Sequence, residues 1–241
     1  MKLLPLISNA VIAALTAAGL AATGAATATE PPFKLTLGSY DMPSNRGTDV
    51  NLRWRRDDTN AWVGYYRDAG FGTQWRSGFD SSVALGDWAS LQPSLQLASQ
   101  GFVGGSLNLQ VGTTIYAVVG LGRTNLRPYF NLNFDPNDAV TLGLGWRGEQ
   151  GQNLALTLVA DDRLHTGQQH LHLNGRWPLA GGERLTLDLL HKQGSGDAGY
   201  VRAWGWSVGY DWPRWFAKLA RDPKQNFGVA DATRLSVGVR F

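Results

Sequence analysis

The last nine residues of the chain, TRLSVGVRF, constrain the fold more than any other segment. Apolar and polar side chains alternate along it, and the segment ends on the aromatic Phe241. Successive side chains of a β-strand point to opposite faces of the sheet, so this segment has one apolar and one polar face. We therefore predict that the chain ends inside a sheet with one apolar face.

The N-terminal segment predicts export. Met1 and Lys2 precede an apolar, Ala-rich run that continues to about Ala22, and Ala26-Thr27-Ala28 has the small-residue pattern of a cleavage site. We predict a cleaved signal peptide over 1–28, which is read by the Sec pathway, and a single domain over 29–241. A membrane-anchoring helix is the alternative, but no stop-transfer charge cluster follows. Because the sequence has no cysteine, it offers neither a disulfide nor a lipid-anchor acceptor.

An exported chain whose final strand alternates up to a terminal Phe resembles the bacterial outer-membrane β-barrels. The resemblance implies that Leu235, Val237, Val239 and Phe241 form the signal read by the barrel assembly machinery. It also implies residence in the bacterial outer membrane and contact with its lipid and lipopolysaccharide. It does not extend to a named family or an activity.

The composition agrees with this fold class. Hydrophobic residues make up 43% of the chain, yet no apolar run beyond the signal approaches the roughly 20 residues of a membrane helix. Apolar residues instead alternate with polar ones in segments separated by turns, with 10 Trp and 30 Gly in the chain. Aromatic residues near the segment ends, among them Trp62 and Tyr66, are expected in two lipid-facing girdles. We predict an all-β, transmembrane, antiparallel up-and-down β-barrel, and a two-sheet sandwich is the alternative. The dispersed net charge of +3 argues against a nucleic-acid partner.

The number of strands is less certain than their type. About fifteen alternating segments can be marked, but single-chain bacterial barrels have an even number of strands. We favour 14 strands, with 12 as the alternative, and expect the miscount at Phe33–Tyr40 or in the Gly-rich stretch 98–127, where a bent strand or an inward loop would resolve it. Connections at 82–87, 163–168, 194–199 and 222–232 are expected outside the cell, and those at 68–70, 179–183 and 211–213 inside.

The polar faces of the segments predict a charged lumen, because lipid cannot hydrogen-bond a charge. The predicted lumen-lining or binding residues are Arg53, Arg55, Arg76, Asp80, Asn131, Asn133, Arg147, Asp161, His170, His172, Arg176, Asp188, Asp211, Arg234 and Arg240. Such charges either pair and fill the interior or line a narrow aqueous path. A barrel of 12 to 14 strands lies between filled small barrels and open large ones.

Asn131 and Asn133 precede a strong turn signal, Asp135-Pro136-Asn137-Asp138. Their amides suit a polar ligand such as a sugar. A second Asp-Pro pair at Asp222-Pro223 could complete a recognition surface on the same rim, although two ordinary turns explain both motifs more simply.

The histidines form part of the densest titratable cluster. His170 and His172 lie two positions apart on one strand face, a spacing that could hold zinc or copper with one further ligand. Lumen histidines bonded to Asn174 or to carboxylates are the simpler interpretation, so we predict no metal site and no cofactor. Whether His165 has more than a structural role is left open.

Enzymatic alternatives have little support. A lipid or lipopolysaccharide hydrolase needs a Ser and a His in contact, and Ser195 with His191 is the nearest pair. A rim protease could use the acidic and His residues of 161–168, but only one loop offers them. We favour a small channel for a polar solute. The alternatives are a membrane hydrolase and a structural or assembly barrel with a filled lumen.

Overall fold

The computed structural model describes residues 31–241 except residue 198, so the predicted signal peptide over 1–28 lies outside the described residues. The chain forms one antiparallel sheet. Its strands are β1 (Phe33–Met42), β2 (Asn45–Arg56), β3 (Thr59–Asp68), β4 (Gly72–Ser81), β5 (Val83–Ala84), β6 (Ala89–Ala98), β7 (Phe102–Gly112), β8 (Ile115–Thr124), β9 (Ala139–Arg147), β10 (Asn153–Asp161), β11 (Gln169–Pro178), β12 (Arg184–Gly196), β13 (Gly199–Asp211), β14 (Trp215–Asp222) and β15 (Ala232–Arg240).

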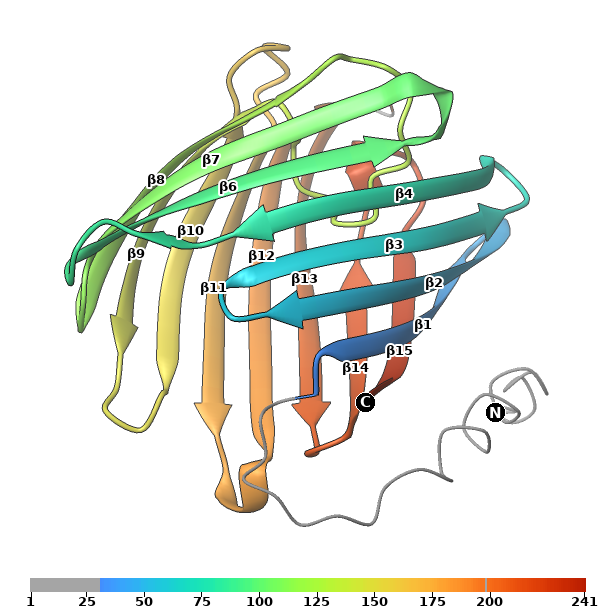
Figure 1. The fold of residues 1–241 in the computed structure, drawn as a ribbon. Coiled ribbons are helices and arrows are strands. Elements are labelled where there is room, and N and C mark those ends of the chain that lie inside the picture. The colour runs from blue at the N-terminus through green and yellow to red at the C-terminus, as the bar shows by residue number, and fades with distance from the viewer. Residues whose placement is uncertain (1–30, 198) are drawn as a thin grey trace.

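The sheet closes on itself because β1 pairs with both β2 and β15 (Figure 1). Phe33 and Phe241 exchange two backbone hydrogen bonds of 3.0 Å at the seam, and their rings stack. The end of the barrel where these residues lie is called here the terminal end, and the opposite end the loop end. The terminal strand predicted from TRLSVGVRF is therefore the closing strand.

The barrel has 14 strands, as favoured from the sequence. β4 and β5 both pair with β6, and Asp80 opposite Ser94 and Val83 opposite Leu91 share one register. β5 is thus a continuation of β4 after an interruption at Ser82. The expected sites of the miscount were wrong, because Phe33–Tyr40 lies within β1 and the stretch 98–127 contains two complete strands, β7 and β8.

Two connections lie at the end opposite to the one expected. The link at 82–87 joins strands at the terminal end, and 68–70 joins β3 to β4 at the loop end. Counting back from Phe241 requires the correct number of intervening strands, so one misplaced strand inverts every assignment before it. The assignments from 163 onward agree with the structure, where no miscount intervenes.

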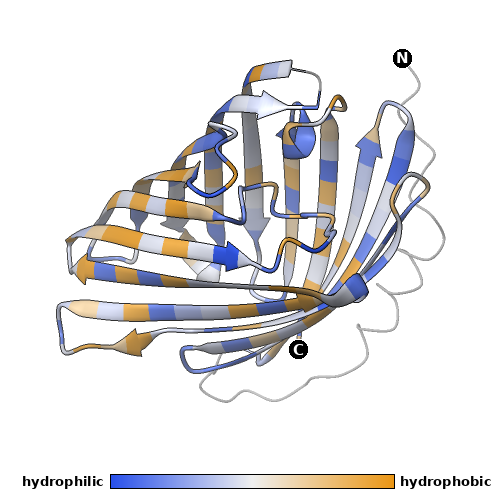
Figure 2. Cartoon of the chain, turned by 90° about the horizontal axis from the view of Figure 1, so that it is seen from above, coloured by the Kyte–Doolittle hydropathy of each residue, from blue (hydrophilic) through white to orange (hydrophobic). Residues whose placement is uncertain are grey.

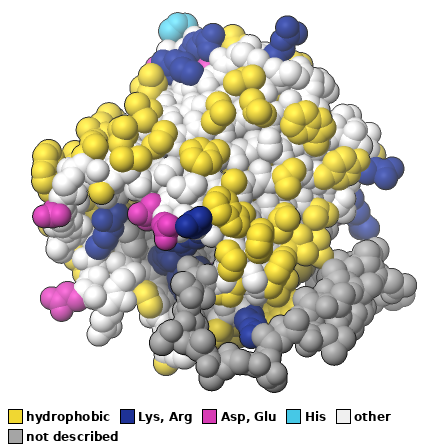
Figure 3. All heavy atoms as spheres, viewed as in Figure 1, with side chains coloured by type: hydrophobic (Ala, Val, Ile, Leu, Met, Phe, Trp, Pro, Cys, Tyr) yellow, Lys and Arg dark blue, Asp and Glu magenta, His cyan; other side chains and the backbone are white. Residues whose placement is uncertain are grey.

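The outer surface of the barrel is apolar. Along each strand apolar and polar residues alternate (Figure 2), and large hydrophobic side chains are spread over the outer face (Figure 3). Val63, Leu142 and Trp206 are 53%, 52% and 42% exposed, as lipid-facing side chains must be. They are not buried between two sheets, which excludes the sandwich.

Two aromatics expected in the lipid-facing girdles point inward instead. Tyr66 is fully buried in the barrel, and Trp62 lines an interior cavity against Arg76. Both belong to the inward series of β3, one position away from outward Val63 and Tyr65. The girdle prediction was wrong for these two residues because it relied on aromatic identity. The alternation of side chains along the strand decides whether a residue faces lipid or the lumen.

The remaining local elements are short 3₁₀ turns, η2 (Ser99–Gly101), η3 (Ala180–Gly182) and η4 (Gln225–Phe227). Across the part of the chain that the structure describes, no helix is long and apolar enough to cross a membrane.

A lipid-facing charge should destabilise this fold far more than a lumen-facing one. Leu142→Arg places a cation against hydrocarbon near the middle of β9, and we expect it to lower the free energy of unfolding by about 2–4 kcal/mol. The neighbouring Thr141→Arg points inward and should cost less than about 1 kcal/mol. Denaturant unfolding in lipid vesicles measures both variants, and equal losses would contradict the assigned faces.

Candidate functional site

The segment between β8 and β9, residues 125–138, folds into the barrel and is called here the inner loop. Its apolar residues recur at alternate positions, Phe130, Leu132 and Phe134, so the segment has one apolar edge. That edge needs an apolar surface away from water, and the loop end of the lumen provides one. Phe134 adopts a left-handed backbone with φ of 69°, a conformation that a bulky residue keeps only when its surroundings fix it.

The inner loop packs against inward residues of β1, β3 and β15. Tyr40, Met42, Tyr66 and Ala232 form with Leu132 and Phe134 a buried cluster, and Phe130 packs against it. The Phe130 ring stacks on Tyr66 with centroids 4.7 Å apart. Residues that alternation assigns to a polar lumen thus form a small hydrophobic core at the loop end.

Side chains of the barrel wall satisfy the backbone of the inner loop. The Gln74 amide donates to the Phe130 carbonyl at 3.0 Å, and its oxygen accepts from the Phe130 N–H at 2.9 Å. Arg234 donates to the Leu132 carbonyl at 3.1 Å. Asn226 of the β14–β15 connection donates to the Asn131 carbonyl at 3.0 Å. These bonds supply the partners that a loop away from bulk water requires.

Asp138 fixes the end of the inner loop. Its carboxylate accepts from the Thr124 N–H at 3.0 Å, the Thr124 hydroxyl at 2.6 Å and Arg163 at 2.8 Å. Burial raises the pKa of this carboxyl, but the hydrogen bonds outweigh burial and hold the pKa below its ordinary 3.8. Asp138 therefore anchors the loop as a charged group at neutral pH.

Two interior cavities flank the inner loop. Cavity A, of about 580 Å³, lies between the loop and β10 to β14, and cavity B, of about 460 Å³, lies against β1 to β4 and β14 to β15. Asn133, Lys218 and Arg234 line both cavities. The boundary between the two cavities is thus formed by one loop amide and two wall cations.

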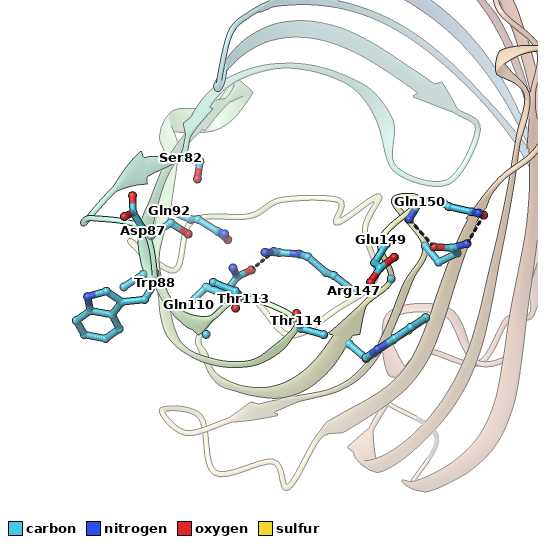
Figure 4. A pocket seen from close by; sticks show the side chains of 16 residues that line it. Ser82, Asp87, Trp88, Gln92, Gln110, Thr113, Thr114, Arg147, Glu149 and Gln150 are labelled. Atoms are coloured by element: carbon cyan, nitrogen blue, oxygen red, sulfur yellow. Dashed lines mark hydrogen bonds between the residues drawn. The ribbon is translucent and has the colours of Figure 1, made fainter.

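A larger vestibule of about 910 Å³ opens at the terminal end. It is lined by the turns between β5 and β6, β7 and β8, and β9 and β10. Arg147 reaches across it and donates to the Gln110 side chain at 2.6 Å, whereas Trp88 points away from the hollow (Figure 4). The interior is therefore packed at the loop end and hollow toward the terminal end.

The lumen carboxylates are matched by cations or hydrogen-bond donors. Asp49 binds Arg76 at 2.8 Å, and Asp211 binds Arg240 and Arg184. The buried ammonium of Lys192 lies 2.7 Å from Asp222. Asp80 accepts from Asn60 at 2.8 Å, and Asp161 is used within its own turn by Arg163, Leu164 and Thr166. Little negative charge is therefore left unmatched around cavities A and B.

Several lumen cations have no carboxylate partner within the described residues. They are Lys34, Arg53, Arg147, Lys218 and Arg234. Some of them lie over aromatic rings: Lys34 over Phe216 at 3.9 Å and Arg147 over Tyr116 at 4.4 Å. A ring face orients a cation without neutralising it, so these groups keep their positive field.

The charged side chains predicted for the lumen all lie on the inner face of the barrel. Paired residues of antiparallel strands share a face, and the registers place together Arg53 with Trp62, Arg176 with Thr186, and Asp188 with Asn174 and Ser207. The same holds for Arg55, Arg76, Asp80, Arg147, Asp161, His170, His172, Asp211, Arg234 and Arg240. Their part in binding a solute stays a prediction.

The two predicted loop amides differ in their surroundings. The Asn131 amide donates to the Asp135 carbonyl at 2.5 Å, and its oxygen accepts from the Asn133 N–H at 3.0 Å. Asn131 is thus used inside the loop, whereas exposed Asn133 lines both cavities. The second Asp-Pro motif is also internal, because Asp222 binds Lys192.

His170 and His172 lie beside a carboxylate of the inner loop. Asp135 Oδ1 is 2.7 Å from His170 Nδ1 and 3.1 Å from His172 Nε2, and His172 Nδ1 is 3.1 Å from Asp188 Oδ1. Burial raises the pKa of Asp135, but the histidine hydrogen bonds outweigh burial and keep it well below its usual range. The carboxylate partners predicted for the histidines are therefore present, in Asp135 and Asp188.

The geometry does not assemble the enzymatic alternatives. Ser195 and His191 both lie on the outer series of β12, four positions apart, which is roughly 13 Å along a strand. His191 packs against Trp204 instead. Asp161 caps the turn that contains His165, so its oxygens are occupied.

Sequence reasoning missed several interior residues. Lys34 and Lys218 could have been found, because each alternates with outward residues of its strand: Leu35 and Leu219 lie next to them. The sequence around Asp135 indicates only a turn. Nothing local in the sequence shows that this turn descends to meet β11.

The comparisons with known proteins agree on the fold. No family model matches the chain, and no curated protein sequence matches it. The crystal structure of the Acinetobacter baumannii outer membrane protein Omp33 is similar with a TM-score of 0.61 at 11% identity, over 88% of this chain and 99% of that one. The KdgM porin (TM-score 0.49, 9% identity, 86% of this chain and 99% of that one) and the NanC porin (0.46, 8%, 87% and 98%) also match. The likeness to Omp33 shows that the chain has the fold of an outer-membrane β-barrel.

The anchoring of the inner loop should depend on pH through Asp138. A carboxyl whose pKa is lower folded than unfolded stabilises the folded state above the unfolded pKa, and this contribution is lost as the pH falls through the folded value. We expect hydrogen exchange of 124–138, corrected for intrinsic rates, to stay slow from neutral pH to 3.8 and to accelerate below it. Asp138→Asn should ease opening at neutral pH by about 1.5–3 kcal/mol and remove the dependence. A wild-type response identical to that of Asp138→Asn would contradict this.

Proposed function

We propose that the protein is an outer-membrane channel for polar solutes that favours anions, with the inner loop as its constriction. The carrying observation is the excess of cations over free carboxylates around cavities A and B. Arg53 and Arg234 are central to it, because a guanidinium stays charged at any physiological pH. Cations on the walls of a low-dielectric passage raise the local concentration of anions.

Three features favour a transport function over a purely structural barrel with a filled lumen. The vestibule and both cavities are open spaces inside the barrel, so the interior is not filled by side chains. The inner loop narrows the lumen without filling it, since cavities A and B remain on its two sides. Exposed Asn133 stands between cavities A and B, beside Lys218 and Arg234. A polar anion would meet amide and cationic donors there.

The route to the membrane and the partners belong to the same proposal. We infer that 1–28 directs export through the Sec pathway. We also infer that Leu235, Val237, Val239 and Phe241 present the closing strand to the barrel assembly machinery, and that the outer face contacts lipid and lipopolysaccharide. The apolar outer face and the seam at Phe33 and Phe241 support these inferences.

The buried cluster at the loop end favours a second candidate, a structural barrel whose inner loop is a permanent plug. Gln74 and Tyr66 hold the loop, and both side chains are almost completely buried. The two candidates differ in ionic current. A plugged barrel gives no current in a planar bilayer, whereas a constricted channel gives discrete steps.

Anion preference is the first test of the channel. In a KCl gradient near 0.1 M, where the Debye length is about 10 Å, we expect the reversal potential to show chloride preference. The preference should shrink near 1 M salt, where the Debye length is about 3 Å. Arg53→Gln with Arg147→Gln should move the reversal potential toward zero, and outward Arg67→Gln should not. Cation preference in the wild type would overturn the proposal.

The inner loop as constriction is the second test. Phe134→Ala removes a buried ring whose loss costs about 3–5 kcal/mol in a packed core, so the loop should loosen and single-channel conductance should rise. Leu126 lies in the same loop and is 51% exposed, so Leu126→Ala is the matched control. Conductance unchanged in Phe134→Ala, with the barrel folded by gel mobility, would remove the loop from the permeation path.

A further inference from the structure

We propose that Asp135, His170 and His172 form a binding site for a divalent transition-metal ion of the zinc type, which fastens the inner loop to the barrel wall. Each residue offers one donor atom, and the three donor atoms lie within 4.8 Å of one another. Two imidazole nitrogens and one carboxylate oxygen are a donor set that zinc binds with its fourth position left for water. The sequence favours hydrogen-bonded histidines over a metal site, and it does not place Asp135, 35 residues from His170 in the chain, beside them.

The present distances are close to those of a metal centre. Two ligands 2.0–2.1 Å from a tetrahedral ion are separated by about 3.4 Å. The Asp135 oxygen lies 2.7 Å from His170 Nδ1 and 3.1 Å from His172 Nε2. Separating them by a few tenths of an ångström requires only a small movement of the loop, since Asp135 belongs to the inner loop and both histidines to β11.

His172 also has the outer contact that metal-binding histidines use. Its Nδ1 faces Asp188 of β12 at 3.1 Å. Such a carboxylate accepts the ring N–H and leaves the other nitrogen to bind the ion. His170 has its only polar contact at Nδ1, because its Nε2 is buried without a hydrogen-bond partner. Each ring therefore directs one nitrogen atom toward the Asp135 carboxylate.

His172 lies between two carboxylates, Asp135 at Nε2 and Asp188 at Nδ1. A metal ion bound to Nε2 would also bind the Asp135 oxygen and His170 Nδ1, while Asp188 accepts the N–H at Nδ1. Binding replaces protons on the ligand nitrogens, so affinity should fall as the pH falls.

A hydrated ion can reach the site from the lumen. Asp135, His172 and Asp188 all line cavity A, whereas His170 is fully buried behind them against Phe227. The position facing cavity A is then the one that keeps water. An ion bound there joins the inner loop to β11 by coordination bonds, in addition to the contacts of Gln74 and Arg234.

The test is metal binding by the full barrel, refolded in detergent and stripped with chelator. Zn²⁺ is measured by equilibrium dialysis and Co²⁺ by its visible absorption. We expect one ion per chain, with the cobalt spectrum of a four-coordinate nitrogen and oxygen site. His172→Ala and Asp135→Asn should abolish binding, and Asp188→Asn should weaken it by about 10–100-fold. His165 and His191 are the remaining histidines, so His165→Ala with His191→Ala is the matched control and should bind normally.

Folding and loop position are followed independently. Asp135→Asn changes the loop rather than the wall, and gel mobility shows whether each barrel is closed. Zn²⁺ should slow hydrogen exchange of the inner-loop amides in the wild type but not in Asp135→Asn. The proposal is overturned if the wild type binds no Zn²⁺, if Asp135→Asn binds it equally, or if binding disappears only with His165 and His191.

Discussion

The constraint on which this structure depends is that lipid offers no hydrogen bonds to a peptide group. Every strand must therefore pair on both sides, and the pairing of β1 with β15 satisfies the last two edges. Closure fixes the alternation of faces, since the side chain after an outward Leu must point inward. The charged lumen, the apolar girdle and the position of Phe241 at the seam all follow from this requirement.

The same constraint explains how the inner loop is built. A loop that leaves the strand ladder loses its backbone partners, and Gln74, Arg234 and Asn226 replace them from three places on the wall. Its apolar edge then buries Leu132 and Phe134 in a cluster that no strand forms alone. The wall side chains that bind the loop are not available to contact a solute in the lumen. Others, such as Arg53 and Arg147, remain without a carboxylate partner.

Much of the fold could be predicted from alternation, because the face of a strand residue is a local property. The inward arginines and the closing strand at Leu235 to Phe241 are examples. What failed depends on relations between distant segments. One interruption at Ser82 inverted the assignment of two turns, and Trp62 was placed by its chemistry rather than its parity.

The candidate site was less predictable than the barrel. His170 and His172 share a face by spacing alone, but Asp135 meets them only because residues 125–138 enter the lumen. That descent rests on contacts with β1, β3, β4 and β15, which no local pattern records. The unpaired state of Lys34 and Lys218 similarly depends on which acids are already matched by other cations.

The central claim is that ionic side chains line an aqueous lumen while apolar side chains face lipid. Because the chain has no cysteine, single cysteines at Leu52 and Arg53, neighbours on β2, test it without background. In lipid vesicles, a charged, water-soluble thiol reagent should modify Arg53→Cys rapidly and Leu52→Cys hardly at all. Equal modification at both positions, or preference for position 52, would contradict the account.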